Sequence, residues 1–203
     1  MNGDETSPER TALLDAAEAL IRANGADGWE LAQLAERAGV GLDEVQAQFD
    51  DTWDAFCHVI RRDEERYDES VALRPSQTSP SERILALLEA CVPDYDWTFW
   101  IELWSLALRD ERAVALQIEL DERFRNVIEE VLRDGVETGE FTVADPRRAA
   151  ITISALLDAM ALQATLGDTT IRPNYMLDAC VTVCGILLGA PLKLRPLAEP
   201  DDG

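Results

Sequence analysis

The sequence has very little positive charge. Lys193 is its single lysine and His58 its single histidine, and 18 basic side chains stand against 40 acidic ones, a formal net charge of −22 over 203 residues. Such a charge favours solubility and repels nucleic acids and anionic lipids at long range. Composition leaves two explanations of the lysine scarcity open, a GC-rich codon bias and a salty cell interior.

Long apolar runs and paired cysteines are also missing. No stretch of about 18 apolar residues exists, which excludes a membrane-spanning helix, and residues 1–10 do not resemble a signal peptide. Cys57, Cys91, Cys180 and Cys184 form no CxxC pair. We therefore expect a cytoplasmic protein with reduced core cysteines. Cys180 and Cys184 share a helix face, where packing at a dimer interface is favoured over redox sensing.

Recognisable catalytic patterns are absent from the sequence. It has no glycine-rich phosphate loop, no nucleophile elbow and no metal-spaced cluster, so it predicts no catalytic residue, no metal and no cofactor. The carboxylate pairs Asp50-Asp51 and Glu129-Glu130 diverge by about 100° on a helix and do not converge on one substrate. We therefore expect a protein that is not an enzyme.

Helical periodicity dominates what is present, and it predicts an all-α fold. The expected domains are a flexible tail (1–8), a three-helix helix-turn-helix domain (9–51), a larger ligand-binding and dimerisation domain (52–190) and a flexible acidic tail (191–203). Residues 74–79 are a polar break between the two domains. The expected helices cover about residues 8–24, 30–38, 42–48, 52–70, 80–92, 94–108, 111–138, 145–166 and 175–188.

The segment Gly28–Ile60 is typical of a helix-turn-helix. Its first short helix buries Leu31, Leu34 and Ala35, Gly39-Val40-Gly41 makes the turn, and the second short helix hides Val45. Its charge is unusual for a module that reads DNA, because residues 9–60 hold three arginines and eleven carboxylates, a formal charge of −8. Specific DNA binders neutralise several phosphates, about 6–10 in well-studied cases.

Short stretches along the chain resemble a known family. The N-terminal ones are Leu13-Leu14 with Ala17, Gly25, Leu34-Ala35 with Ala38-Gly39-Val40, and Val45 with Phe49. With them the chain resembles the tetracycline-repressor (TetR) family of bacterial transcription regulators. The C-terminal half is similar to the subgroup typified by the betaine repressor (BetI). Its matching stretches are Trp97 to Arg109, Gly135-x-x-x-Gly139-Glu140-Phe141, Asp145-Pro146 and Leu156-Leu157-Asp158.

This resemblance, over about residues 9–188, implies a homodimer that pairs through its last two helices. It also implies two helix-turn-helix modules in successive major grooves of an operator, and a small-molecule effector bound in the larger domain. The DNA-facing positions that it implies are Arg10, Glu30, Leu42, Asp43, Glu44, Gln46, Ala47, Gln48 and Thr52.

Several of those positions depart from the family pattern. Glu30 stands where a hydroxyl is usual, Gly41 stands where serine usually opens the recognition helix, and Thr52 replaces a lysine that commonly grips phosphate. Asp43 and Glu44 stabilise the first turn of that helix by about 0.3–1 kcal/mol each through its dipole. They also occupy the positive end of the helix, which would otherwise attract phosphate. Gln46 and Gln48 remain able to read adenine edges, and Arg10 to reach the DNA backbone or minor groove.

Trp97, Trp100 and Trp104 share one helical face with Leu108, which indicates either core packing or the lining of a ligand cavity. Indole faces near carboxylates such as Asp158 favour a cationic ligand through cation–π contacts of about 0.5–2 kcal/mol. The full set of candidate ligand residues is Trp97, Trp100, Trp104, Phe124, Ile128, Asp158, Met160 and Gln163.

Two functions therefore follow from the sequence. The first is a homodimeric regulator that binds operator DNA and answers to a small molecule. The alternative is a non-DNA-binding relative, a small-molecule sensor or protein-interaction module whose acidic helix-turn-helix has lost operator binding. The sequence names neither the operator nor the effector, nor does it distinguish repression from activation.

Overall fold

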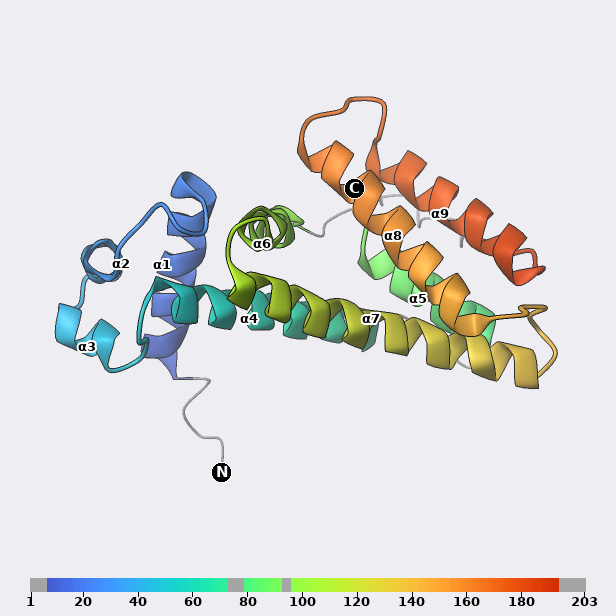
Figure 1. Ribbon diagram of the computed structural model, residues 1–203, viewed down its shortest axis with the longest axis horizontal. Coiled ribbons are helices and arrows are strands. Elements are labelled where there is room, and N and C mark those ends of the chain that lie inside the picture. Colours follow the sequence, from blue (N-terminus) through green and yellow to red (C-terminus); the bar gives the residue numbers. More distant parts are fainter. Residues whose placement is uncertain (1–6, 73–78, 93–95, 194–203) are drawn as a thin grey trace, which may run out of the picture. The chain divides into compact units, whose positions relative to one another are not determined.

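Helices make up all the regular structure in the described part of the chain, which confirms the all-α prediction. The computed structural model describes residues 7–72, 79–92 and 96–193 (Figure 1). Its helices are α1 (Pro8–Asn24), α2 (Leu31–Ala38), α3 (Leu42–Gln46), α4 (Thr52–Ala72), α5 (Pro80–Ala90), α6 (Thr98–Ala107), α7 (Glu111–Glu137), α8 (Pro146–Thr165) and α9 (Pro173–Leu188).

Local capping residues explain where most of these helices begin. Ser7, Asp51 and Asp145 each accept the backbone N–H three residues later, over 3.2, 2.8 and 3.0 Å. These bonds satisfy donors that have no partner inside the helix, and Pro8 and Pro146 occupy first positions where a missing N–H costs nothing. The predicted starts at these three places are confirmed.

Several predicted helix ends differ from the structure by two residues or more, and two of these differences have a clear local cause. α3 ends at Gln46 instead of Gln48, because the N–H groups of Gln48 and Phe49 both bond the Val45 carbonyl (3.0 and 2.9 Å) and tighten the last turn. α6 begins at Thr98 instead of Asp94, because the Asp96 carboxylate accepts the Thr98 N–H over 2.9 Å in a turn before the helix. Asp94 lies outside the described residues, as does the predicted break at 74–78.

The chain forms two compact units, residues 1–69 with 96–118 and residues 70–95 with 119–203. α6 and most of α4 thus belong with the N-terminal unit, whereas the predicted domain ranges 9–51 and 52–190 place both in the second domain. The reason is burial, since α4 contributes Ala55, Phe56, Val59 and Ile60, all fully buried. Of the predicted tails, residues 1–6 and 194–203 lie outside the described part.

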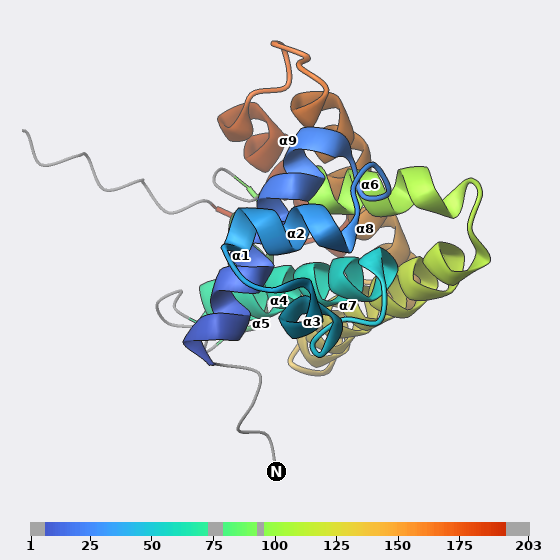
Figure 2. The same cartoon turned by 90° about the vertical axis from the view of Figure 1, so that its left-hand side faces the viewer.

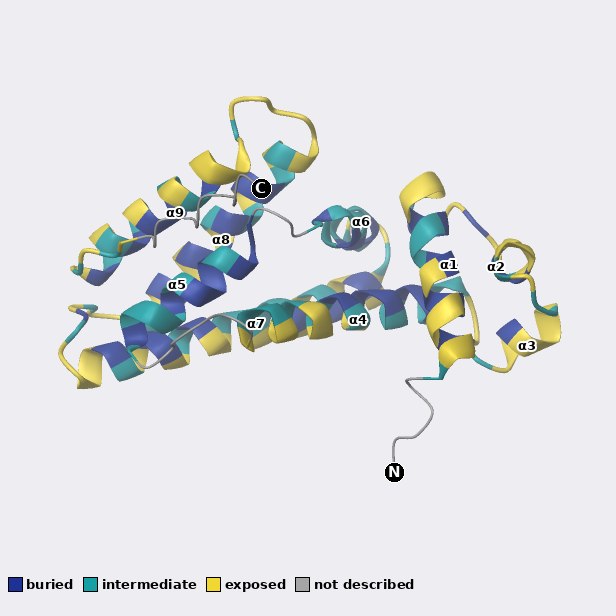
Figure 3. Cartoon of the chain, turned by 180° about the vertical axis from the view of Figure 1, so that it is seen from behind, coloured by how far each residue is buried: buried dark blue, intermediate teal, exposed yellow. Residues whose placement is uncertain are grey.

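In the N-terminal unit, α1 packs on α2, and α2 on α3. Each helix turns one apolar face inward, and Figure 3 shows these buried faces against exposed outer ones. The fully buried side chains of this core include Ala17, Leu34, Val45, Phe56 and Val59.

Polar contacts connect α6 and the turn before it to α1 and to the loop after α1. The carboxylate of Glu102 accepts the Ala26 N–H over 3.0 Å. Arg22 pairs with Asp96, and its guanidinium lies 4.5 Å from the centre of the Phe99 ring. These contacts explain why α6 is part of this unit although it is far from α1 in sequence.

The C-terminal unit explains the Gly135-x-x-x-Gly139-Glu140-Phe141 motif. A Cβ on Gly135 would collide with the ring of Phe141, which is 3% exposed. Gly139 takes a left-handed φ of 76° just after α7. The Glu140 carboxylate then accepts the backbone N–H (3.2 Å) and hydroxyl (2.8 Å) of Ser81 at the start of α5. The motif therefore ends α7 and holds α5 beside it.

All four cysteines are free thiols, three of them buried. Burial raises the pKa of Cys180 to about 11 and that of Cys184 to about 12, which keeps both protonated and unreactive at neutral pH. This supports a packing role over a redox role. None of the described helices is long and apolar enough to cross a membrane.

Candidate functional site

A sharp turn separates α2 from α3 in the N-terminal unit. Gly39 takes the left-handed region (φ 73°, ψ 29°), and its N–H and that of Val40 bond the Ala35 carbonyl over 2.9 and 3.1 Å. A residue with a side chain is strained in that region, which explains the glycine. Two residues later α3 begins after Gly41, and the pair forms a helix-turn-helix (Figure 2).

α3 buries one side chain and exposes the others. Val45 is fully buried. Figure 3 shows that most of the surface of α3 is exposed. The exposed candidates on and just after this helix are Leu42, Asp43, Glu44, Gln46 and Ala47. The structure therefore brings these five predicted DNA-facing residues onto one short exposed segment.

The two carboxylates at the start of α3 both lie close to Gly41. Glu44 accepts the Gly41 N–H over 3.1 Å, which caps the helix. An oxygen of Asp43 lies over Gly41, where a Cβ would collide with it. The acidic sequence thus has a local structural cause, because Glu44 satisfies a donor that a serine at position 41 could not.

Arg10 lies inside the module. It is 8% exposed, its Nη1 donates to Gln48 Oε1 over 2.7 Å, and its guanidinium lies 5.2 Å from the centre of the Phe49 ring. Two predicted DNA-facing residues, Arg10 and Gln48, are therefore bound to each other. The contact joins α1 to the segment after α3.

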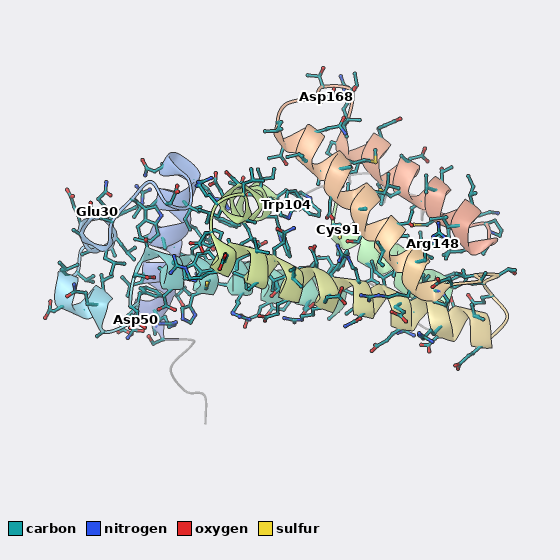
Figure 4. The ribbon with its side chains drawn as sticks, viewed as in Figure 1. Glu30, Asp50, Cys91, Trp104, Arg148 and Asp168 are labelled. Atoms are coloured by element: carbon teal, nitrogen blue, oxygen red, sulfur yellow. The ribbon has the colours of Figure 1, made fainter. Side chains whose placement is uncertain are left out.

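The other predicted DNA-facing residues lie at helix starts. Glu30 is exposed just before α2, where its N–H donates to the Gln33 side chain over 2.8 Å (Figure 4). Thr52 is the first residue of α4 and is half-buried. Between residues 28 and 52, Arg37 is the single basic side chain, and it is exposed beside exposed carboxylates: Glu30, Glu36, Asp43, Glu44, Asp50 and Asp51.

The tryptophans of α6 do not form its core face. Phe99, Leu103 and Leu106 are the buried side chains of the helix, whereas Trp100 and Trp104 are half-buried. Trp97, just before the helix, is 9% exposed, but Leu108, expected on the same stripe, is 87% exposed. The prediction that the stripe is simply core is therefore wrong at Leu108. That these indoles line a ligand cavity stays a prediction (Figure 4).

In the C-terminal unit, Asp158 of α8 lies near Asp121 and Arg125 of α7. The pKa of the Asp158 carboxyl is raised to about 7, chiefly by burial and then by the nearby charge of Asp121. Arg125 and a hydrogen bond with buried Ser154 oppose that shift. Arg125 also pairs with Asp121 over 3.0 Å. Its guanidinium also lies 3.7 Å from Glu122, so three carboxylates surround it.

The other candidate ligand residues have different surroundings. Ile128 is 1% exposed on α7, and Phe124 is half-buried there. Met160 is buried with its sulfur 3.9 Å from that of Cys180, at the contact of α8 with α9. Gln163 is exposed and donates to the Ala159 carbonyl over 3.1 Å. The tryptophans belong to the N-terminal unit and these residues to the C-terminal one.

Sequence reasoning missed Asp121 and Arg125. Their spacing of four residues on a long helix signals a pair, but nothing in it indicates that Asp158 lies beside them. No pattern in the sequence indicates that Glu102 of α6 contacts the Ala26 N–H. Within the described residues, no group of His, Cys, Asp and Glu side chains could hold a metal ion.

Residues 80–188 match a family model described as the C-terminal domain of the BetI-type transcriptional repressor. The match spans α5 to α9 and more than half of the chain. No curated protein matches the sequence.

Solved structures share the fold over nearly the whole chain. A protein described as a transcriptional regulator from Pseudomonas aeruginosa PAO1 is 24% identical, with a TM-score of 0.72 over 93% of this chain and 96% of that one. A regulator from Saccharomonospora viridis, in complex with choline, is 22% identical, with a TM-score of 0.74 over 84% and 92%. A TetR-family regulator from Rhodococcus is 18% identical, with a TM-score of 0.80 over 90% and 100%.

Proposed function

Because the chain belongs to the TetR family of transcriptional regulators, with a C-terminal domain of the BetI type, we propose that it regulates transcription in response to a small cation. In this proposal a homodimer binds operator DNA through α2 and α3, and an effector bound in the C-terminal domain alters that binding. The observation that carries the proposal is the helix-turn-helix itself, with its left-handed Gly39 turn and an α3 exposed on all but one side chain.

The negative charge of the helix-turn-helix opposes DNA binding, but one of its carboxylates is already hydrogen-bonded within the module. Glu44 is held on the Gly41 N–H, so its carboxylate stabilises the helix that enters the groove. Repulsion between the remaining carboxylates and phosphate weakens with salt, since the screening length falls to about 3 Å at 1 M. Binding in this proposal depends less on phosphate neutralisation than is usual, and more on base contacts from α3.

A cationic effector fits the C-terminal unit. Asp158, Asp121 and Glu122 lie around the guanidinium of Arg125, and a cation beside Asp158 would stabilise its ionised carboxylate. The similar regulator from Saccharomonospora viridis was solved with choline, which makes choline the natural first probe.

DNA binding is tested with the full-length protein and a labelled duplex from upstream of its own gene. Fluorescence anisotropy is measured over a salt series from about 50 to 200 mM, with an unrelated duplex of the same length and composition as control. We expect tighter binding to the upstream duplex than to the control, with a shallower salt dependence than a basic DNA-binding module shows, because screening of the carboxylates offsets the loss of phosphate contacts. No binding at any salt in the series, with and without choline, would overturn the proposal and favour a sensor that does not bind DNA.

Effector binding is tested by calorimetry with choline and with its neutral carbon isostere, 3,3-dimethylbutan-1-ol. The two have the same shape, so any difference reports the charge. We expect choline to bind and the alcohol to bind at least about tenfold more weakly, in line with a site built on carboxylates. Equal binding of the two would overturn the cationic character of the site, and no binding of either would remove quaternary ammonium compounds of this size as effectors.

A further inference from the structure

Gln46 and Gln48 differ in what their side-chain amides are free to do. Gln46 is exposed at the end of α3, and its amide makes no hydrogen bond within the described part of the chain. Gln48 Oε1 accepts from Arg10 over 2.7 Å. A bidentate contact to adenine needs both the oxygen and the NH₂ of one amide, so Gln46 can make it and Gln48 cannot without breaking the Arg10 contact.

Apolar side chains flank Gln46 on the exposed surface. Leu42, four residues earlier and therefore on the same side of the helix, is 41% exposed. Ala47 follows Gln46 directly and is exposed as well. In the major groove, small apolar side chains contact the methyl group that distinguishes thymine from the other bases.

The side chains that make the usual contact to guanine are missing from α3. The helix has no lysine or arginine, the residues that make the usual bidentate contact to guanine. A carboxylate can accept from the amino group of cytosine, but that of Glu44 is held on the Gly41 N–H. Asp43 is exposed, and one of its carboxylate oxygens lies near Gly41 at the start of the helix. The side-chain amide that α3 itself offers is that of Gln46, and its neighbours Leu42 and Ala47 are apolar.

We propose that α3 reads A·T base pairs, with Gln46 as the residue that specifies adenine and Leu42 and Ala47 against thymine methyl groups. Gln48 is a positioning residue that Arg10 holds in place. The inference rests on the proposed DNA binding and assigns the class of operator, a two-fold symmetric site with A·T pairs where each α3 enters the groove.

Affinity selection from a library of randomised duplexes tests this with the full-length protein at low salt. The wild-type chain is expected to enrich duplexes with A·T pairs at matching places in two half-sites. Gln46→Ala is expected to lose the preference at one base pair per half-site, where wild-type discrimination is about 5- to 150-fold. Gln46→Arg is expected to move that preference to guanine.

Gln48→Ala is the matched control, since it removes the same amide two residues away. It is expected to weaken binding to all duplexes alike and to keep the base preference. Circular dichroism checks that each variant is folded. Two results would overturn this inference without contradicting DNA binding. One is a preference for G·C pairs at the α3 contact, and the other is an adenine preference that survives Gln46→Ala but not Gln48→Ala. No duplex bound at any salt would overturn the proposed function and this inference with it.

Discussion

The guanidinium of Arg10 donates a 2.7 Å hydrogen bond to the side-chain oxygen of Gln48. The two residues are 38 positions apart, and Arg10 is 8% exposed. The contact therefore closes the helix-turn-helix on itself, with α1 holding the segment that follows α3. An arginine used in this way adds stability to the module and is not offered to a phosphate.

Arg10→Met tests this role, because methionine keeps the apolar stem and removes the guanidinium. We expect the free energy of unfolding to fall by about 1–3 kcal/mol, from the lost charged hydrogen bond and the contact with Phe49. Urea denaturation at neutral pH measures it. Arg37→Met is the control, since Arg37 is exposed and has no side-chain contact within the described residues.

If Arg10 is instead a phosphate contact, the outcome is different. Stability would then be the same in Arg10→Met and Arg37→Met, and the slope of log affinity against log salt would become shallower by about one contact. That combination would contradict the positioning role.

The difference between expectation and structure at Arg10 has a simple cause. Helix starts at Ser7, Asp51 and Asp145 were predictable because a cap involves residues three apart. The turn at Gly39 was predictable for the same reason. The burial of Arg10 depends on how α1 packs beside the end of α3, which no local pattern encodes.

The same distinction holds in the C-terminal unit. Asp158 stood out in the sequence as a carboxylate within an apolar run, but its neighbours Asp121 and Arg125 belong to another helix. Periodicity indicates which face of a helix is apolar, and it does not indicate which residues of two helices meet. Trp100 and Trp104 show the converse case, since helical spacing placed them on one face but did not reveal that the face is only half-buried.

Gly135 offers a second stability test. A Cβ at this position would collide with the Phe141 ring, and the neighbouring backbone is fixed by the 2.9 Å bond from the Phe141 N–H to the Gly135 carbonyl. We expect Gly135→Ala to lower the free energy of unfolding by about 1–3 kcal/mol through overpacking, as measured in urea. Gly135→Ala combined with Phe141→Leu, which makes room for the methyl group, should cost less than the sum of the single changes. Additive costs would contradict the collision.

Charge removal at α3 is expected to strengthen DNA binding. Asp43→Asn with Glu44→Gln removes two charges, and the glutamine oxygen still accepts the Gly41 N–H, so the cap survives. We expect affinity for duplex DNA to rise about 3- to 10-fold per charge at low salt and to approach the wild-type value at high salt. Anisotropy titrations measure this.

Thr52→Lys, added to the double change Asp43→Asn with Glu44→Gln, should steepen the dependence of log affinity on log salt by about 0.9.

Glu137→Gln is the matched control for the removal of charge from α3, because it removes an exposed charge in the other compact unit. An equal gain from Glu137→Gln would mean that net charge matters and that the position on α3 does not.

Asp158 makes stability depend on pH. Its pKa is about 7 in the folded chain against an ordinary 3.8, chiefly because of burial and then because of Asp121. Between about pH 4 and 7 the unfolded chain loses this proton and the folded chain keeps it, so the free energy of unfolding falls as pH rises through that window. Asp158→Asn should match wild type near about pH 4 and exceed it by on the order of 1–3 kcal/mol near pH 8. Asp178→Asn, an exposed change on α9, should show no such crossover.

The same titration governs the proposed effector. A cation attracts the ionised carboxylate and not the protonated one, so choline should bind more tightly as pH rises through about 7. Binding near that pH should also release a proton, because the cation lowers the pKa of Asp158. Calorimetry in two buffers of different ionisation enthalpy measures the release directly. Asp158→Asn should abolish both the pH dependence and the proton release. A choline affinity that stays constant from about pH 6 to 8 in the wild-type protein would mean that the cation does not face Asp158.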